Sequence, residues 1–416
     1  MNAPIMQRRV AHRIFKCFVV SAVFCAVAIT TLLASLWLEH RTEVTLPTPT
    51  GPFAVGRVLC YWTDAETVDT LAPVPGTKRE LLVWIWYPAA GGKATAIADY
   101  LPARLRAAVE HNRSPLIGTL LTRDLAKVHA HSLRNPSVSS QQRSYPVVIM
   151  RAGASLEVWN YSTLAEDLAS HGYVVVGFDA PYRSMVVILP GGRVITRLPQ
   201  NNPELCLEMT GQEQERCANR LLGAWTSDMV FALDRLTALN ASDPSGTLTG
   251  RLDMSRVGVF GHSFGGTTVA EFCHEDSRCK AGIDVDGALH GSVIQAGINR
   301  PFMFLLSDHS RESDPQASEI LANMQSVYER LPPKEGLFVE IRGANHFLFT
   351  DDGALLKSRI VLRILRTLGI VRIDGRRQLA ATAYCLRSFF DSWLKGADVS
   401  QPKIPSSLYP ELQILE

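Results

Sequence analysis

Apolar stretches of two lengths recur along this chain, and the longest of them is typical of a membrane span. Residues 17–38 form 22 consecutive positions without a charge, enough for a helix that crosses a hydrocarbon core of about 30 Å. Arginine and lysine residues precede this run, so the positive-inside rule places the tail 1–16 in the cytoplasm and the remaining chain in an exported space. The alternative is a signal segment that is cleaved to release a secreted protein, although its apolar region is usually about 7–15 residues long.

Shorter apolar runs follow a linker that we expect at 39–56, where threonine, proline and glycine are frequent. Several of these runs are continuously hydrophobic, which is typical of strands covered by helices on both faces. Predicted strands span 58–62, 81–87, 147–150, 173–178, 257–260, 281–285, 301–306 and 337–341, and predicted helices span 163–170, 225–239, 315–331 and 379–394. This alternation predicts an α/β fold, a mostly parallel doubly wound sheet, at 57–416.

Two stretches do not fit the alternation of strands and helices. We predict insertions at 95–142, as helices and loops, and at 181–222, which is rich in proline and glycine. Long segments over the edge of a sheet are usually lids or binding loops, and a plain surface excursion is the alternative.

Charge and composition exclude some classes of function. Hydrophobic residues make up 46% of the 416 residues, which is enough for a large buried core. Lysine and arginine number 42 and aspartate and glutamate 40, so the sequence lacks the basic stripe that binds nucleic acid.

Cysteine and histidine spacing points to disulfides rather than to a metal. Of eight cysteines, two close pairs would each seal a short loop in an oxidising compartment, and free thiols are the alternative. The pairs are Cys206 with Cys217 and Cys273 with Cys279, while Cys60 and Cys385 are expected to be single buried residues. Neither pair has zinc spacing, and the doublet His129 and His131 has no carboxylate or cysteine nearby in the sequence, so we expect no metal and no cofactor.

The segment 256–272 carries the strongest chemical signal. It contains Gly-x-Ser-x-Gly between a predicted strand and a predicted helix, with Ser263 at the centre. The sharp turn of such a motif needs glycine at 261 and 265 and presents the serine hydroxyl at the top of the sheet. The alternative is an ordinary glycine-rich turn; a phosphate-binding loop is excluded because its glycine and lysine spacing is missing.

A serine nucleophile needs a histidine base and a carboxylate that orients the histidine. His346 follows the last predicted strand and is the expected base, whereas His290 and His309 are better explained as loop residues. Two acids fit the chain order Ser, Asp, His, because Asp286 and Asp308 end consecutive predicted strands. The pattern alone leaves both open.

The chain at this point resembles a known family. Residues 50–56, 78–88, 261–266, 282–287 and 343–347 are similar to motifs of the platelet-activating factor acetylhydrolase family (plasma-type, group VII phospholipase A2) and its bacterial relatives, which belong to the α/β-hydrolases. The resemblance covers about residues 49–411 and favours Asp286 over Asp308, because the family acid is the second aspartate of a Gly-Ile-x-x-Asp pattern. With Asp286 as the acid, we expect Asp284, two residues earlier, to have a structural role.

The same resemblance extends to the oxyanion hole. One backbone donor is expected at Phe264, the residue after the nucleophile. The family carries the other donor after a His-Gly pair, which maps onto Ala154 following Gly153; the histidine is replaced by Ala152. This departure leaves a backbone donor but puts the loop orientation and the acyl pocket in doubt.

These residues predict a membrane-tethered serine hydrolase of the periplasm or an equivalent exported space, and Ser263, His346 and Asp286 carry its chemistry. The resemblance implies hydrolysis of short or oxidised acyl esters, including phospholipid sn-2 acetyl groups. A general carboxylesterase or polyester hydrolase of the same fold is the alternative enzyme. A non-catalytic binding protein is the alternative class, and reaction with a fluorophosphonate separates it from both enzymes.

Overall fold

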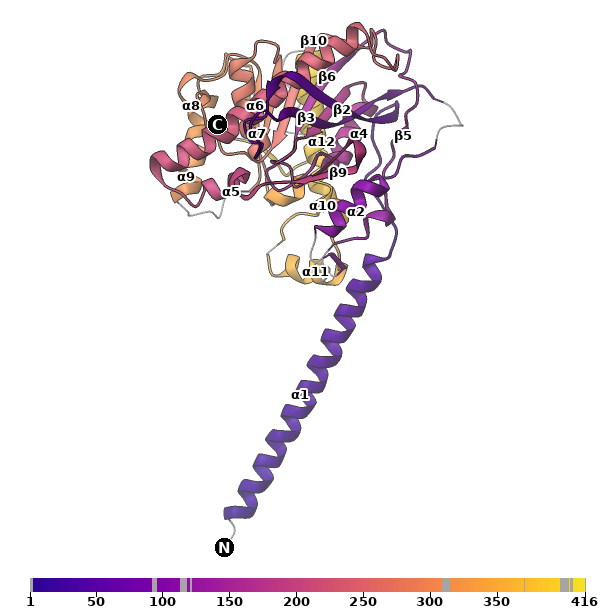
Figure 1. Cartoon of the computed structure of the whole chain (residues 1–416). Helices are drawn as coiled ribbons and strands as arrows, with labels where there is room; N and C mark the ends of the chain where they lie inside the picture. Colours follow the sequence, from indigo (N-terminus) through magenta and orange to yellow (C-terminus); the bar gives the residue numbers. More distant parts are fainter. Residues whose placement is uncertain are drawn as a thin grey trace.

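A ten-stranded sheet runs through the domain in the order β14-β13-β12-β11-β10-β6-β7-β3-β2-β5 (Figure 1). The computed structural model describes residues 3–91, 96–112, 118–119, 122–308, 315–369, 371–396, 404 and 407–415. The strands are β2 Ala54–Val68, β3 Lys78–Ala89, β5 Leu133–Arg134, β6 Tyr145–Arg151, β7 Val174–Asp179, β10 Leu252–His262, β11 Ala281–Val285, β12 Phe302–Leu306, β13 Gly336–Ile341 and β14 Leu412–Ile414. Neighbouring strands from β7 to β13 are parallel, whereas β3 is antiparallel to both β7 and β2.

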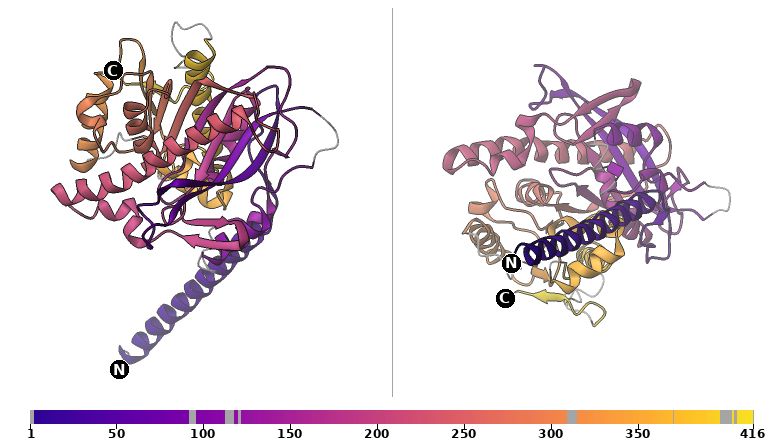
Figure 2. Two further views of the ribbon diagram at one scale, coloured as in Figure 1. Left: turned by 45° about the horizontal axis from the view of Figure 1, so that its top comes forward. Right: turned by 90° about the horizontal axis from the view of Figure 1, so that it is seen from below.

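Helices cover both faces of this sheet, and the strand pattern explains why (Figure 2). Along β3, Trp84 and Trp86 pack into the core on one face, while Val83 and Ile85 pack into the core on the other. One face is covered by α4 (Ser162–Ser170) and α12 (Gly375–Lys395), and the opposite face by α6 (Gly211–Ala241), α7 (Phe264–Glu275) and α9 (Pro315–Tyr328). The predicted doubly wound α/β fold is confirmed, and the eight predicted strands are all present.

The two predicted insertions differ from the expectation in how much regular structure they contain. Within 95–142, strand β5 pairs with β2, so this segment extends the sheet by an edge strand. Within 181–222 lies an antiparallel hairpin, and α6 begins at Gly211 rather than at residue 225.

The remaining elements are α2 Ala103–His111, η1 Leu125–Lys127, β4 Val128–His129, η2 Val158–Tyr161, β8 Val186–Leu189, η3 Pro190–Gly192, β9 Arg193–Thr196, η4 Pro199–Asn201, α5 Pro203–Cys206, α8 Val293–Ala296, η5 His346–Phe349, α10 Asp352–Leu355 and α11 Arg359–Thr367.

A long helix, α1 (Ala3–His40), projects from the domain (Figure 1). Its segment 12–40 is long and apolar enough to cross a membrane by length and composition. The segment expected to be a linker, 39–56, contacts the domain, because β1 (Val44–Thr45) pairs with β4 and the Leu46 side chain is buried in the core. The Thr50 amide also donates to Asp167 Oδ1 at 2.9 Å. These contacts hold the junction against the domain.

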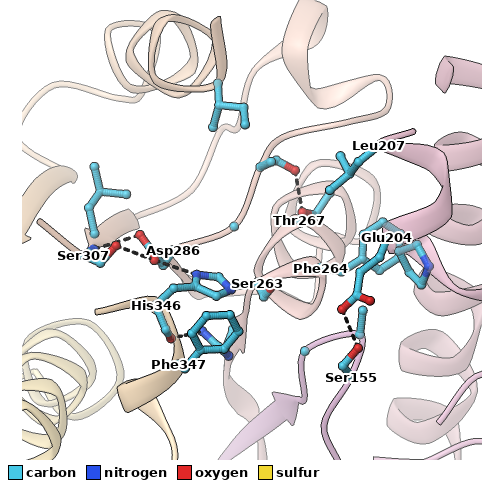
Figure 3. A pocket seen from close by; sticks show the side chains of 18 of the residues that line it. Ser155, Glu204, Leu207, Ser263, Phe264, Thr267, Asp286, Ser307, His346 and Phe347 are labelled. Atoms are coloured by element: carbon cyan, nitrogen blue, oxygen red, sulfur yellow. Dashed lines mark hydrogen bonds and ion pairs between the residues drawn. The ribbon is translucent and has the colours of Figure 1, made fainter. Parts of the chain in front are cut away.

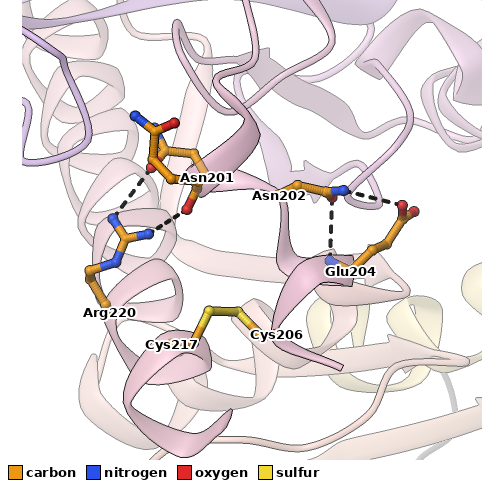
Figure 4. Close-up of a disulfide and its surroundings, with 7 residues drawn as sticks. Asn201, Asn202, Glu204, Cys206, Cys217 and Arg220 are labelled. Atoms are coloured by element: carbon orange, nitrogen blue, oxygen red, sulfur yellow. Dashed lines mark hydrogen bonds between the residues drawn. A yellow bond between two sulfur atoms is a disulfide. The ribbon is translucent and has the colours of Figure 1, made fainter. Parts of the chain in front are cut away.

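Both predicted disulfides are present. Cys206 joins Cys217 and thereby links α5 to α6 (Figure 4), and Cys273 joins Cys279 at the end of α7. Cys385 is buried as expected, whereas Cys60 is only half-buried. The apolar N-terminal helix and the two disulfides together suggest export, because such bonds persist in oxidising compartments.

Removal of the Cys206–Cys217 bond is expected to lower the free energy of unfolding. The bridge closes a loop with a sequence separation of 11 residues, for which chain-entropy arguments give about 2–4 kcal/mol. Denaturant unfolding of a Cys206→Ser/Cys217→Ser variant measures this loss, with Cys60→Ser as the matched control. An unchanged unfolding midpoint in the double variant would contradict the prediction.

Candidate active site

Ser263 lies on a strained turn between β10 and α7. Its φ of +56° is left-handed backbone, which costs a residue with a side chain about 1–3 kcal/mol. A Cβ on Gly261 would collide with the Gly265 backbone, and a Cβ on Gly265 would lie 2.5 Å from the Ala152 oxygen. The two glycines therefore allow the turn to close tightly, which leaves Ser263 at the carboxyl end of the sheet.

The His346 side chain lies between Ser263 and Asp286 (Figure 3). His346 Nδ1 donates to Asp286 Oδ2 at 2.7 Å. Ser307 also donates to this carboxylate, from its amide to Oδ1 at 2.8 Å and from its hydroxyl to Oδ2 at 2.7 Å. Among the described residues no hydrogen bond joins Ser263 Oγ to His346, and such bonds often tighten only when substrate binds. Asp286 is thus held firmly as an acceptor for the histidine.

The alternative residues lie elsewhere around the site. Asp308 Oδ2 accepts a hydrogen bond from the Gly343 amide at 2.6 Å and forms an ion pair with Arg372. The structure therefore brings Asp286, and not Asp308, to His346 Nδ1. His290 lines the same pocket, and His309 lies outside the described residues.

Asp284 lies behind the nucleophile turn. Its Oδ1 accepts a hydrogen bond from the Gly287 amide at 2.9 Å, while its Oδ2 is buried without a partner among the described residues. Burial raises the pKa of Asp284 to about 8, against the lowering effect of the Gly287 bond. The position expected to be structural thus holds a carboxyl group that binds its proton more tightly in the folded state than in the unfolded state.

Asp284 is expected to make stability fall with pH. A carboxyl whose pKa is raised on folding contributes fully below its unfolded pKa of about 3.9, and this contribution is lost as pH rises toward about 8. Asp284→Asn replaces the ionisable carboxyl with a neutral amide of similar shape, so the variant should gain thermal stability relative to wild type at pH 8 and little at pH 5. Melting temperatures across this range test it; a pH-independent difference would contradict it.

The expected oxyanion donors face the same pocket. Among the described residues, the amides of Phe264 and Ala154 have no hydrogen-bond partner. The neighbouring amide of Gly153 is occupied, because it donates to the Tyr161 hydroxyl at 3.1 Å. Arg197 Nη1 donates to the Ala154 carbonyl at 2.7 Å and so holds the next peptide of this loop, between Ala154 and Ser155. Two free amides near one serine can stabilise an oxyanion, each to the extent of about 2.7–4 kcal/mol.

A cavity of about 720 Å³ opens in front of Ser263, within the size range of small-molecule sites. Its walls are mostly apolar and come from the loop after β6, from α5 and the residue after it, from α9 and from η5; they include Leu156, Leu207, Ile320, Leu321, Met324 and Phe347. Within the described part of the chain, no lysine or arginine lines it. The cavity therefore suits an uncharged or zwitterionic ester better than an anionic one.

A metal site is not formed by the residues that the structure describes. They contain no group of three or more His, Cys, Asp or Glu side chains that could hold an ion. The fold brings one carboxylate to His129 from a distant part of the sequence, since its Nε2 lies 3.6 Å from Glu43 Oε2. The His131 ring instead bonds to the Leu46 carbonyl at 3.0 Å.

Sequence reasoning missed several residues that hold the site together. Ser307 precedes Asp308 at the end of β12, so the same strand-end signal that selected Asp308 could have found it. Two other side chains bond to the loop after β6: Tyr161, 8 residues after Gly153, and Arg197, 43 residues after Ala154. Trp225 packs edge-on against Phe264, with ring centroids 5.1 Å apart. No local pattern marks these three residues.

Proteins similar to this chain have the names of acetylhydrolases or esterases. The family model "Platelet-activating factor acetylhydrolase, isoform II" matches residues 38–395. A probable 1-alkyl-2-acetylglycerophosphocholine esterase of Arthroderma benhamiae is 25% identical, covering 95% of this chain and 98% of that protein. A platelet-activating factor acetylhydrolase of Cavia porcellus is 23% identical, covering 78% of this chain and 74% of its own. The structure of a ferulic acid esterase from Streptomyces cinnamoneus matches with a TM-score of 0.70 and 26% identity, covering 90% of this chain and 100% of that one.

Proposed function

This chain belongs to the platelet-activating factor acetylhydrolase, isoform II, family, and we propose that it is a serine-dependent hydrolase of carboxylic esters with short or oxidised acyl groups. The observation that supports this most strongly is the His346 ring between Asp286 and the nucleophile turn, within a large apolar cavity. The phospholipid sn-2 acetyl group is the substrate that the family suggests.

Acylation in this proposal begins with Ser263. His346 Nε2 removes the hydroxyl proton while Ser263 Oγ attacks the ester carbonyl, and Asp286 stabilises the imidazolium through its 2.7 Å bond to Nδ1. The tetrahedral oxyanion accepts hydrogen bonds from the amides of Phe264 and Ala154. His346 then gives its proton to the leaving alcohol, and the acyl group stays on Ser263.

Deacylation repeats these steps with water. His346 removes a proton from the water that attacks the acyl-enzyme, and the carboxylic acid leaves as Ser263 recovers its proton. All groups used are side chains or amides of this chain, so the proposal needs no cofactor.

The cavity and the family together support the proposed substrate class. A cavity of about 720 Å³ is far larger than an acetyl group, so its apolar walls can also contact the alkyl part of the alcohol. The absence of lysine and arginine among the described lining residues agrees with a zwitterionic headgroup. A short acyl group then occupies the end of the cavity nearest Ser263.

The test of this proposal combines labelling with an ester panel. Wild type and Ser263→Ala are each prepared from residue 45 onward and as the full chain. Each protein is incubated with a fluorophosphonate, and its intact mass is then measured by mass spectrometry. One adduct on wild type and none on the variant supports an activated Ser263; no adduct on folded wild type overturns the hydrolase and favours a binding protein. Rates on p-nitrophenyl acetate, p-nitrophenyl octanoate and a 2-acetyl glycerophosphocholine then report acyl and headgroup preference.

A general carboxylesterase or polyester hydrolase is the second candidate. The observation that favours it is the match to a ferulic acid esterase over the full length of that chain. Higher kcat/KM for methyl ferulate or a soluble polyester fragment than for the 2-acetyl phospholipid would select this candidate.

We further propose that α1 is retained as a membrane anchor with the domain on the exported side. Residues of the domain bind three backbone carbonyls at the C-terminal end of α1. Lys357 Nζ donates to the Leu36 carbonyl at 3.2 Å, Arg123 Nη1 donates to the Glu39 carbonyl at 2.8 Å, and the Asp124 amide donates to the His40 carbonyl at 3.1 Å. Cleavage after residue 40 would remove all three acceptors, so these contacts favour a chain that keeps the end of α1.

Intact mass of the protein recovered from membranes of the expressing cells tests the anchor. The full-chain mass in the membrane fraction supports retention, and a soluble exported form that begins between residues 30 and 45 overturns it. Lys357→Met with Arg123→Leu is the matched structural variant, because loss of both contacts should speed protease cleavage between the helix and the domain.

A further inference from the structure

His262 precedes the nucleophile and touches two other loops of the site. It is the last residue of β10, its side chain is buried with 2% exposure, and its ring lies 4.6 Å from the His346 ring, centroid to centroid. Its Nε2 is 3.0 Å from the backbone carbonyl of His346, and its Nδ1 is 2.8 Å from the Tyr161 hydroxyl. The proposed catalytic triad of Ser263, His346 and Asp286 does not use this histidine.

Three hydrogen bonds link Gly153, Tyr161, His262 and His346 in sequence. Their directions are fixed because the first group in this chain can only donate and the last can only accept. The Gly153 amide can only donate, so it donates to the Tyr161 oxygen at 3.1 Å. The phenol proton is then free for His262 Nδ1, and His262 Nε2–H donates to the His346 carbonyl, which can only accept. We call the loop after β6, which contains Gly153 and Ala154, the oxyanion loop. Only one placement of protons satisfies the chain of hydrogen bonds from this loop through Tyr161 and His262 to the backbone of His346.

Burial keeps the two side chains in the required protonation states. Burial, followed by the neighbouring His346, lowers the pKa of His262 to about 3, so the ring is neutral and carries one N–H. Burial likewise raises the pKa of Tyr161, so the phenol keeps its proton. The arrangement is thus unchanged across the neutral pH range.

We propose that Tyr161 and His262 are positioning residues that hold the base loop and the oxyanion loop at a fixed separation from Ser263. This inference rests on the proposed function. The loop after β6 carries the Ala154 amide, the turn after β10 carries Ser263 and the segment after β13 carries His346; Tyr161 and His262 join all three. A displacement of about 1 Å of a reacting group can cost about 100-fold in rate.

The space around Gly153 gives an independent reason for this positioning. A Cβ at this position would lie 3.2 Å from Ser263 Cβ and 3.4 Å from His262 Nδ1. The oxyanion loop therefore packs directly on the nucleophile turn, and the Tyr161 bond determines which way its amides face. Because Gly153 N–H points to Tyr161, the next amide, that of Ala154, is left for the substrate.

Tyr161→Phe in the full chain is the main test, because it removes one oxygen and keeps the ring. We expect kcat for p-nitrophenyl acetate to fall about 10- to 100-fold with KM within about threefold of wild type. Tyr173→Phe is the matched control: this buried tyrosine donates to Asp391 at 2.7 Å away from the site, so it should lose stability and keep its kcat.

His262 variants test the other part of the proposal, the hydrogen bond from His262 to the His346 carbonyl. His262→Gln retains an N–H that reaches toward the His346 carbonyl, so it should keep more kcat than His262→Leu, which has none. In the Tyr161→Phe/His262→Leu double variant, kcat should be no lower than in His262→Leu, since the effects of substitutions are not additive when the residues act as one unit. If His262→Leu does not fold, the double variant with His262→Gln serves the same comparison.

The outcomes separate this inference from the proposed function. Wild type that is neither labelled by a fluorophosphonate nor active overturns the proposed function. Labelled, active wild type together with a folded Tyr161→Phe variant whose kcat is within about twofold of wild type overturns only the positioning role. Multiplicative losses in the double variant also overturn it, because the two side chains would then act separately.

Discussion

Replacement of Ser263 by alanine is expected to lower kcat for ester hydrolysis by about 10⁶-fold, the loss seen when the nucleophile of a serine triad is removed. Alanine also accepts the left-handed φ of +56° at this position no worse than serine does, so the fold should survive. The measurement is the rate on p-nitrophenyl acetate for a variant whose circular dichroism and melting temperature match those of wild type.

A matched control for this variant is Ser307→Ala. Ser307 donates to the acid from its hydroxyl, but its amide bond to Asp286 Oδ1 at 2.8 Å does not depend on the side chain. Its kcat should therefore fall far less than that of Ser263→Ala. A folded Ser263→Ala protein with more than a tenth of the wild-type rate would refute the proposed nucleophile.

Asp286→Asn is expected to lower kcat by about 10⁴-fold. An amide at this position can donate to His346 Nδ1 instead of accepting from it, which favours the tautomer that cannot take the serine proton. The backbone here has a φ of +55°, and asparagine tolerates this region as well as aspartate does. The rate on p-nitrophenyl acetate at neutral pH gives the measurement.

Asp308→Asn is the discriminating partner of that experiment. Asp308 binds Arg372 and the Gly343 amide rather than the His346 ring, so its loss should reduce stability and change kcat by less than about tenfold. The reverse ranking, with Asp308→Asn inactive and Asp286→Asn active, would transfer the role of acid to Asp308.

Local pattern predicted much of this protein, because strands, helices and the nucleophile turn depend on nearby residues. Continuous apolar runs placed the parallel strands, and glycines at 261 and 265 marked the turn around Ser263 before the structure showed that side chains there would collide with backbone. The spacing of Cys206 and Cys217 allowed a disulfide that the structure contains. Each of these signals lies within a few residues of sequence.

The boundaries of the elements were less predictable, because packing extends them. Helix α6 begins at Gly211 and not at residue 225, since the bond between Cys206 and Cys217 and the contacts of Arg220 with Asn201 and Gln200 hold its first turns (Figure 4). The lack of periodicity predicts a tether at 39–56, yet Leu46 is buried in the core. Burial of this kind depends on partners far away in the sequence.

The sequence by itself determined the fold class, the position of Ser263 and two candidate acids at consecutive strand ends. Only the tertiary structure decided which acid meets His346, because both carboxylates follow strands at the same edge of the sheet, and Asp286 reaches the His346 ring while Asp308 binds Arg372 and the Gly343 amide. It also brought Tyr161, 101 residues before His262 in the chain, to that ring. Hydrogen bonds between loops of different strands require distances and directions that sequence spacing does not contain.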